Sequence, residues 1–156
     1  MSFPGPEFER IGQWFAQDQI GDYRGALVIP ETADGRVLFQ MGDDVAGIVA
    51  PGKWGLFGGG IDPGETPVQA ACRELIEEIG HARALSYFIP LFSVLTGAPN
   101  WGLLYVFRLE LTLDASDINV REGGGFALAT RAQAEKLDLI GYIRDMLDLF
   151  WVRQTG

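Results

Sequence analysis

The sequence predicts an α/β (α+β) fold in which a mixed β-sheet lies between helices. Three observations favour this class. Short apolar runs with strand-like composition recur along the chain, a marked amphipathic helix interrupts them at residues 66–80, and a second one closes the chain at residues 139–152. We expect one domain over residues 21–156, with an N-terminal extension over residues 1–20.

Composition agrees with a globular domain. The 156 residues are 47% apolar, which is enough for a core without disulfides, and the lone Cys72 reads as a small buried side chain. A net charge of −9 argues against nucleic acid as a partner. Neither a signal peptide nor a long apolar run is apparent, so we expect a cytoplasmic protein without a membrane partner.

The N-terminal extension carries a short apolar stripe. Phe8, Ile11 and Phe15 recur at helical spacing, with Trp14 beside them, and predict a helix. Such a helix either packs on the core of its own domain or serves as a homodimer contact or a lid over the site.

The strands are expected on both sides of the first long helix. A hairpin is predicted at Asp34-Gly35, because this dipeptide suits a tight turn between two apolar runs. A short strand then leads into three glycines, Gly58 to Gly60. The expected strands are Tyr23–Pro30, Arg36–Met41, Trp54–Phe57, Ala84–Thr96, Leu103–Leu111 and Phe126–Ala129. A short helix is expected from Thr130 to Leu137.

The helix at residues 66–80 carries signals at both ends. Thr66 suits the N-cap, Pro67 suits the first helical position, and Gln69 can close a capping box with Thr66. Gly80 suits the left-handed C-terminal stop.

Two faces of this helix differ in character. Glu74, Glu77 and Glu78 lie together on one face, beside Ala70. These acids repel one another by about 0.2–0.5 kcal/mol per pair and lie near the negative end of the helix dipole. The opposite face is apolar and is expected to point into the core; it contains Val68, Cys72, Leu75, Ile76 and Ile79.

The acidic face has two interpretations. It is either a solvated surface or a site for a hard divalent cation, Mg²⁺ or Mn²⁺, which prefers oxygen ligands. Acids placed where the helix disfavours them, next to a glycine turn, indicate a functional site.

The spacing of these residues resembles the signature of the Nudix hydrolases. The pattern is Gly59-x5-Glu65-x7-Arg73-Glu74-Leu75-x-Glu77-Glu78-x-Gly80. Its last position, aliphatic in most relatives, is His81 here, which affects local packing and not the acids. The resemblance implies a Nudix α/β/α sandwich over roughly residues 22–152.

The resemblance also implies roles for individual residues. The metal ligands would be Glu74, Glu77, Glu78 and the backbone carbonyl of Gly58, with Gly59 and Gly60 against the substrate. Arg73 would hold the acids through ion pairs, and Glu65 would brace the loop before the helix.

Two later residues are further candidates. Trp101 either stacks on a base or covers an edge of the core. Glu122, next to three glycines, is either an ordinary loop acid or a second candidate, beside Glu74, for the base that activates water.

The resemblance implies metal-dependent hydrolysis of the pyrophosphate linkage in a nucleoside diphosphate derivative, of the ADP-ribose or nucleotide-sugar type. Two alternatives stay open: hydrolysis of (deoxy)nucleoside triphosphates, including oxidised ones, and a non-catalytic nucleotide-binding module.

Overall fold

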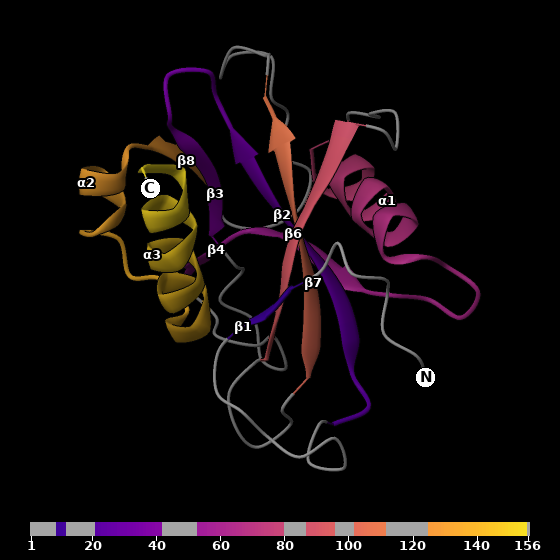
Figure 1. Ribbon diagram of the computed structural model, residues 1–156. Helices are drawn as coiled ribbons and strands as arrows, with labels where there is room; N and C mark the ends of the chain where they lie inside the picture. The colour runs from indigo at the N-terminus through magenta and orange to yellow at the C-terminus, as the bar shows by residue number, and fades with distance from the viewer. Residues whose placement is uncertain are drawn as a thin grey trace.

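The protein has three layers, with a β-sheet between helices on both faces (Figure 1). The computed structural model describes residues 9–11, 21–41, 53–79, 87–95, 102–111 and 125–155. The elements are β1 (Glu9–Ile11), β2 (Arg24–Glu31), β3 (Val37–Met41), β4 (Trp54–Gly55), β5 (Phe57–Gly60), α1 (Pro67–Ile79), β6 (Phe88–Leu95), β7 (Leu103–Glu110), β8 (Gly125–Ala129), α2 (Arg131–Ala134) and α3 (Gly141–Thr155). This architecture confirms the predicted fold class.

The sheet is mixed. Its strand order is β1-β6-β7-β2-β3-β4, with β5 paired to β2 and β8 paired to β3. Strands β2 and β7 run parallel over the full length of both, whereas β6 is antiparallel to β7. Strand β5 pairs antiparallel with the first half of β2. Among the described residues β5 therefore has a strand on one side only.

Strand β2 is buried on both faces of the sheet. Ala26 and Val28 contact the apolar cluster under α1, whereas Leu27 and Ile29 contact the cluster under α3. This alternation follows from the two-residue period of a strand. The same alternation in β7 divides the core into two halves, one for each helical layer.

The predicted turn after β2 begins one residue later than expected. Glu31 extends the strand, and its buried carboxylate accepts a hydrogen bond from Arg108 Nε in β7 at 3.0 Å. The turn itself forms at Thr32 to Gly35. Gly35 has a φ of 88°, the left-handed conformation that glycine adopts at little cost.

The N-terminal extension departs from the prediction where the structure describes it. Glu9–Ile11 form β1, a strand parallel to Phe92–Val94 of β6, so the predicted helix is wrong for these three residues. Pairing with the edge of the sheet outweighs the weak local helical period, as tertiary context commonly does. The rest of residues 1–20 lies outside the described part.

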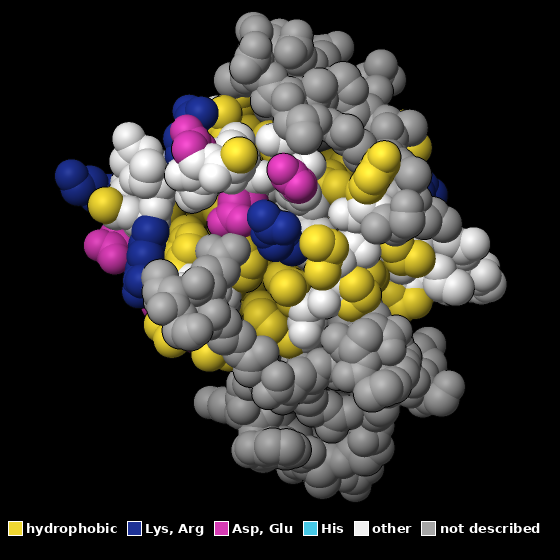
Figure 2. All heavy atoms as spheres, turned by 45° about the horizontal axis from the view of Figure 1, so that its top comes forward, with side chains coloured by type: hydrophobic (Ala, Val, Ile, Leu, Met, Phe, Trp, Pro, Cys, Tyr) yellow, Lys and Arg dark blue, Asp and Glu magenta, His cyan; other side chains and the backbone are white. Residues whose placement is uncertain are grey.

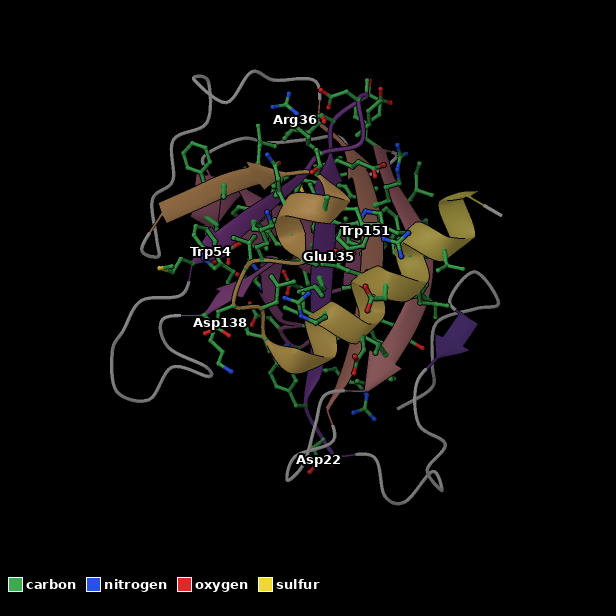
Figure 3. The ribbon with its side chains drawn as sticks, turned by 90° about the vertical axis from the view of Figure 1, so that its left-hand side faces the viewer. Asp22, Arg36, Trp54, Glu135, Asp138 and Trp151 are labelled. Carbon is green, nitrogen blue, oxygen red and sulfur yellow. The ribbon has the colours of Figure 1, made fainter. Side chains whose placement is uncertain are left out.

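The two C-terminal helices cover the face of the sheet opposite α1 (Figure 1). Thr130 and Gln133 form the capping box of α2, which ends at Ala134, three residues earlier than predicted. Figure 3 shows Trp54 of β4 near Asp138 in the α2–α3 connection, and the Trp54 N–H donates to the Asp138 carbonyl at 2.8 Å. This bond ties the C-terminal layer to the sheet.

The surface in Figure 2 is rich in apolar side chains between the areas drawn in grey. Two of the large hydrophobic side chains that stay exposed are Tyr87 and Ile89, at the start of β6. None of the helices in the described residues has the length and apolar character needed to cross a membrane.

Candidate active site

Helix α1 begins as predicted. The Thr66 N–H donates to Gln69 Oε1 at 2.9 Å, and the Gln69 N–H donates to Thr66 Oγ1 at 3.3 Å, which is a complete capping box. This cap fixes the start of α1 directly after the loop that carries Glu65. Gly80, the predicted stop, lies outside the described residues.

The inward face of α1 is rotated from the predicted one. Ala70 and Ala71 are fully buried, although Ala70 was expected on the acidic side, and Leu75 is buried as predicted. Val68 and Cys72 are only half-buried, and Ile76 is 38% exposed. Two small alanines let the helix approach the sheet closely, which turns its acidic side toward β5.

The three acids of α1 are consequently placed in different surroundings. Glu78 is buried, with 7% of the residue exposed, and the Glu74 side chain is 14% exposed. The Glu77 side chain is 48% exposed. The prediction of a uniform acidic face opposite the core is therefore wrong for Glu74, which contacts Gly59 of β5, and for Glu78, which is buried.

Gly59 provides the space for the Glu74 carboxylate. A Cβ atom at Gly59 would lie 2.3 Å from Glu74 Oε1 and 2.5 Å from its carboxyl carbon, far closer than atoms approach. At Gly58 a Cβ atom would lie 2.1 Å from the Ala26 carbonyl oxygen of β2. Gly58 is thus required by its contact with the backbone of the neighbouring strand, whereas at Gly59 a side chain would displace the Glu74 carboxylate.

Arg73 connects the acids, the preceding loop and β5. Its Nε and Nη2 atoms donate to the two Glu65 carboxylate oxygens at 2.8 and 2.9 Å, in a bidentate pair. Nη1 donates to Glu74 Oε1 at 2.9 Å, and Nη2 also donates to the Gly60 carbonyl at 2.8 Å. Glu77 Oε1 lies 3.5 Å from Nη1. The predicted ion pairs of Arg73 with Glu74 and Glu77 are present.

Glu65 is held in its ionised form. Hydrogen bonds from Arg73, and then one from the Asp62 N–H at 2.8 Å, lower the pKa of Glu65 to about 2. The hydrogen bond to Glu65 and then the one to Glu74 raise the pKa of Arg73. The loop before α1 is therefore fixed by charge at any neutral or mildly acidic pH.

Comparison with known proteins decides the family. The model of the NUDIX domain matches residues 21–137 of the chain, which is more than half of it. The chain belongs to the Nudix family.

Relatives of this Nudix domain include the nucleoside triphosphatase NudI of Escherichia coli O1:K1 / APEC. The two are 43% identical over 54 residues, which is 35% of this chain and 37% of NudI. The chain thus spans little more than a third of the length of the curated relatives it matches.

Solved structures share its fold. A MutT protein from Methanosarcina mazei Go1 has a TM-score of 0.72 at 17% identity, over 97% of this chain and 100% of that one. The NUDIX domain of Shewanella oneidensis NrtR, complexed with ADP ribose, has a TM-score of 0.69 at 16% identity, over 90% and 94% of the two chains.

The Nudix acids fit a hard divalent cation by the chemistry of their oxygen donors. Within the described ranges, however, no group of three or more His, Cys, Asp or Glu side chains is gathered closely enough to hold an ion. Arg73 accounts for this arrangement, because Glu74 and Glu77 both turn toward its guanidinium.

Two predicted residues of this Nudix site, Trp101 and Glu122, lie outside the described residues, as does His81.

One residue near the site was missed by the sequence analysis. The Tyr23 side chain lies near Gly60, and its pKa is raised by burial and then by the negative charge of Glu74. Strand alternation could have indicated it, because Tyr23 stands two residues before the bare Gly25 and shares its face of the sheet.

Proposed function

We propose that this Nudix domain is a metal-dependent hydrolase that cleaves the pyrophosphate linkage of a nucleoside diphosphate derivative, of the ADP-ribose or nucleotide-sugar type. One observation carries the proposal. The Glu74 carboxylate lies against the bare backbone of Gly59 and is held there by Arg73, although α1 gains no stability from an acid at that place.

Glu74, Glu77, Glu78 and the Gly58 carbonyl are the residues that would hold Mg²⁺ or Mn²⁺. When bound, the cation would make water a stronger acid and offset the negative charge of the pyrophosphate oxygens. This also explains how a protein with a net charge of −9 accepts an anionic substrate.

The residues of the chain have separate tasks in this proposal. Arg73 orients the Glu74 carboxylate, and Glu65 fixes Arg73 from the other side. Glu74 or Glu122 takes the proton from the attacking water. Gly59 and Gly60 present backbone to the phosphates, since neither has a side chain in the way.

Nucleoside triphosphates are the second candidate substrates. The observation that favours them is the 43% identity to a protein named nucleoside triphosphatase, over 54 residues. The same residues would act on either substrate, because both contain the phosphoanhydride bond that is broken.

The test is release of phosphate or nucleoside monophosphate from ADP-ribose, a nucleotide sugar, the deoxynucleoside triphosphates and 8-oxo-dGTP, with Mg²⁺ and with excess chelator. We expect turnover of the diphosphate derivatives with Mg²⁺ and none with chelator. Turnover of triphosphates alone would support the second candidate. Binding without turnover in every case would support a non-catalytic module and contradict the proposal.

A further inference from the structure

The Tyr23 ring lies across two glycines of neighbouring strands. Gly25 of β2 and Gly60 of β5 are paired in the antiparallel register. Tyr23 Cε1 lies 3.0 Å from the position that a Cβ atom would have at Gly25. On the other side of the ring, Cε2 and the hydroxyl lie 3.7 and 3.8 Å from the corresponding position at Gly60. The ring therefore rests on backbone, with no side chain of either residue beneath it.

Hydrogen bonds hold the main chain at Tyr23 in place. Its carbonyl accepts hydrogen bonds from the Leu103 N–H of β7 and from Arg24 Nη1, both at 3.0 Å. Even so, 48% of Tyr23 is exposed. A large aromatic side chain thus has a fixed main chain but remains partly exposed outside the core.

Tyr23 and Glu74 approach β5 from opposite faces of the sheet. Successive residues of a strand face opposite sides, so Gly59 is open toward Glu74 and the next residue, Gly60, is open toward Tyr23. The edge of β5 away from β2 carries no strand in the part of the chain that the structure describes. At this edge the Gly60 carbonyl accepts a hydrogen bond from Arg73 Nη2. The Tyr23 and Glu74 side chains therefore lie at neighbouring residues of β5, one on each face of the sheet.

We propose that Tyr23 is the stacking platform for the base of the nucleotide whose phosphates lie against the acids of α1. The inference rests on the proposed function and adds a specificity-determining residue to it. A planar base needs a rigid aromatic face, and a ring fixed on two glycines beside the site provides one. The ligand class is a nucleotide, bound with its base on the Tyr23 face of the sheet and its phosphates on the α1 face.

The experiment compares two nucleotide analogues with a third ligand that lacks the nucleoside. α,β-Methylene-ADP and its guanine counterpart carry a base, whereas methylenediphosphonate carries the same phosphonates without one. Binding is measured by calorimetry with Mg²⁺ for the parent and for Tyr23→Ala, Tyr23→Leu and Tyr23→Phe. Tyr87→Ala is the matched control, because Tyr87 is exposed at the start of β6. Thermal unfolding verifies that each variant is folded.

We expect Tyr23→Ala and Tyr23→Leu to bind at least one of the two nucleotide analogues about 5- to 100-fold more weakly, the range for loss of one stacked base. Methylenediphosphonate should bind within about twofold of the parent value, and Tyr23→Phe and Tyr87→Ala should resemble the parent. Steady-state assays of the same variants should show the effect in KM more than in kcat.

Two results would overturn the inference. One is a Tyr23→Leu variant that binds both nucleotide analogues as the parent does, and the other is an equal loss of affinity for the ligand without a base. Either result leaves the proposed function intact if Glu78→Gln still abolishes turnover. A parent protein that neither binds nor cleaves any nucleotide would instead refute the proposed function and the inference with it.

Discussion

Helices α1 and α3 flank the same sheet but bury different chemistry. The buried side chains of α3 that the structure describes are all apolar, with Leu147 fully buried among Ile143, Met146, Phe150 and Trp151. The inward face of α1 has Leu75 and two alanines, and next to them the buried Glu78 and nearly buried Glu74. Burying acids costs free energy, so α1 retains them for a reason other than stability.

The charges at helix ends show the same contrast. On the α3 side, Arg144 Nη2 donates to the carbonyl of Ala134, the last residue of α2, at 3.5 Å, where a cation is favoured by the helix dipole. The last turn of α1 has no basic residue and holds two glutamates instead. The C-terminal layer thus follows the helix dipole, whereas α1 opposes it, which agrees with the proposed cation site.

The largest expected effect is on turnover, from Glu78→Gln. Gln has the same shape but lacks the negative charge, so kcat should decrease on the order of 10²–10³-fold, as for loss of one electrostatic contact in a site. The fold should be retained, as judged by circular dichroism. Asp148→Asn, an exposed acid on α3, is the control and should be as active as the parent. A Glu78→Gln variant as active as the parent would show that this acid of α1 has no more part in turnover than the surface acid of α3.

The complementary change is Leu147→Ala in α3. This side chain is fully buried, so its truncation should lower the free energy of unfolding by about 2–5 kcal/mol. Because the α3 layer has no part in the proposed chemistry, kcat per folded molecule should be unchanged. Denaturant unfolding and steady-state assays together measure both quantities. A decrease in kcat without a loss of stability would contradict the assignment of α3 to the scaffold.

A smaller effect is expected from Gly59→Ala. The new Cβ atom would collide with the Glu74 carboxylate, whose flexible side chain can move away at little cost in stability. The displaced acid should lower kcat by up to about 100-fold, while the melting temperature changes little. Gly141→Ala is the matched control, since a Cβ atom there meets nothing within 4 Å. Equal activity of the two variants would show that the position of Glu74 is unimportant.

The smallest effect concerns pH and Glu65→Gln. The pKa of Glu65 is lowered from 4.5 to about 2 by Arg73 and the Asp62 N–H, so ionised Glu65 stabilises the folded state. This stabilisation is complete above about pH 4.5 and is lost as the pH falls toward 2. The stability difference between the parent and Glu65→Gln should therefore shrink over that range in acid unfolding curves. A difference independent of pH would mean that Glu65 acts by shape alone.

The sequence was sufficient for the elements whose signals are local. The capping box at Thr66, the glycine turn at Gly35 and the stripe of α3 all depend on residues close in the chain, and all were predicted. Helix α1 was also predicted, but its rotation was not. That rotation depends on contact with β5, which a helical wheel cannot reveal.

The candidate site was predicted in part for the same reason. The spacing of the Nudix signature alone predicts Arg73 and the three acids as site residues. The bidentate pair with Glu65 and the contact of Glu74 with Gly59 depend on how the loop folds back on the helix. Tyr23 was missed because its relation to the site comes from strand pairing, through Gly25 and Gly60, and not from any motif.

We propose that the acids of α1 hold a divalent cation, which a titration of the pure protein with Mn²⁺ tests, followed by electron paramagnetic resonance. We expect the parent and Asp148→Asn to bind Mn²⁺, with tighter binding when α,β-methylene-ADP is present. Glu78→Gln should bind at least tenfold more weakly, as expected for loss of a charged ligand. Equal Mn²⁺ affinity in the parent and Glu78→Gln, or no binding even with the nucleotide analogue, would contradict the account.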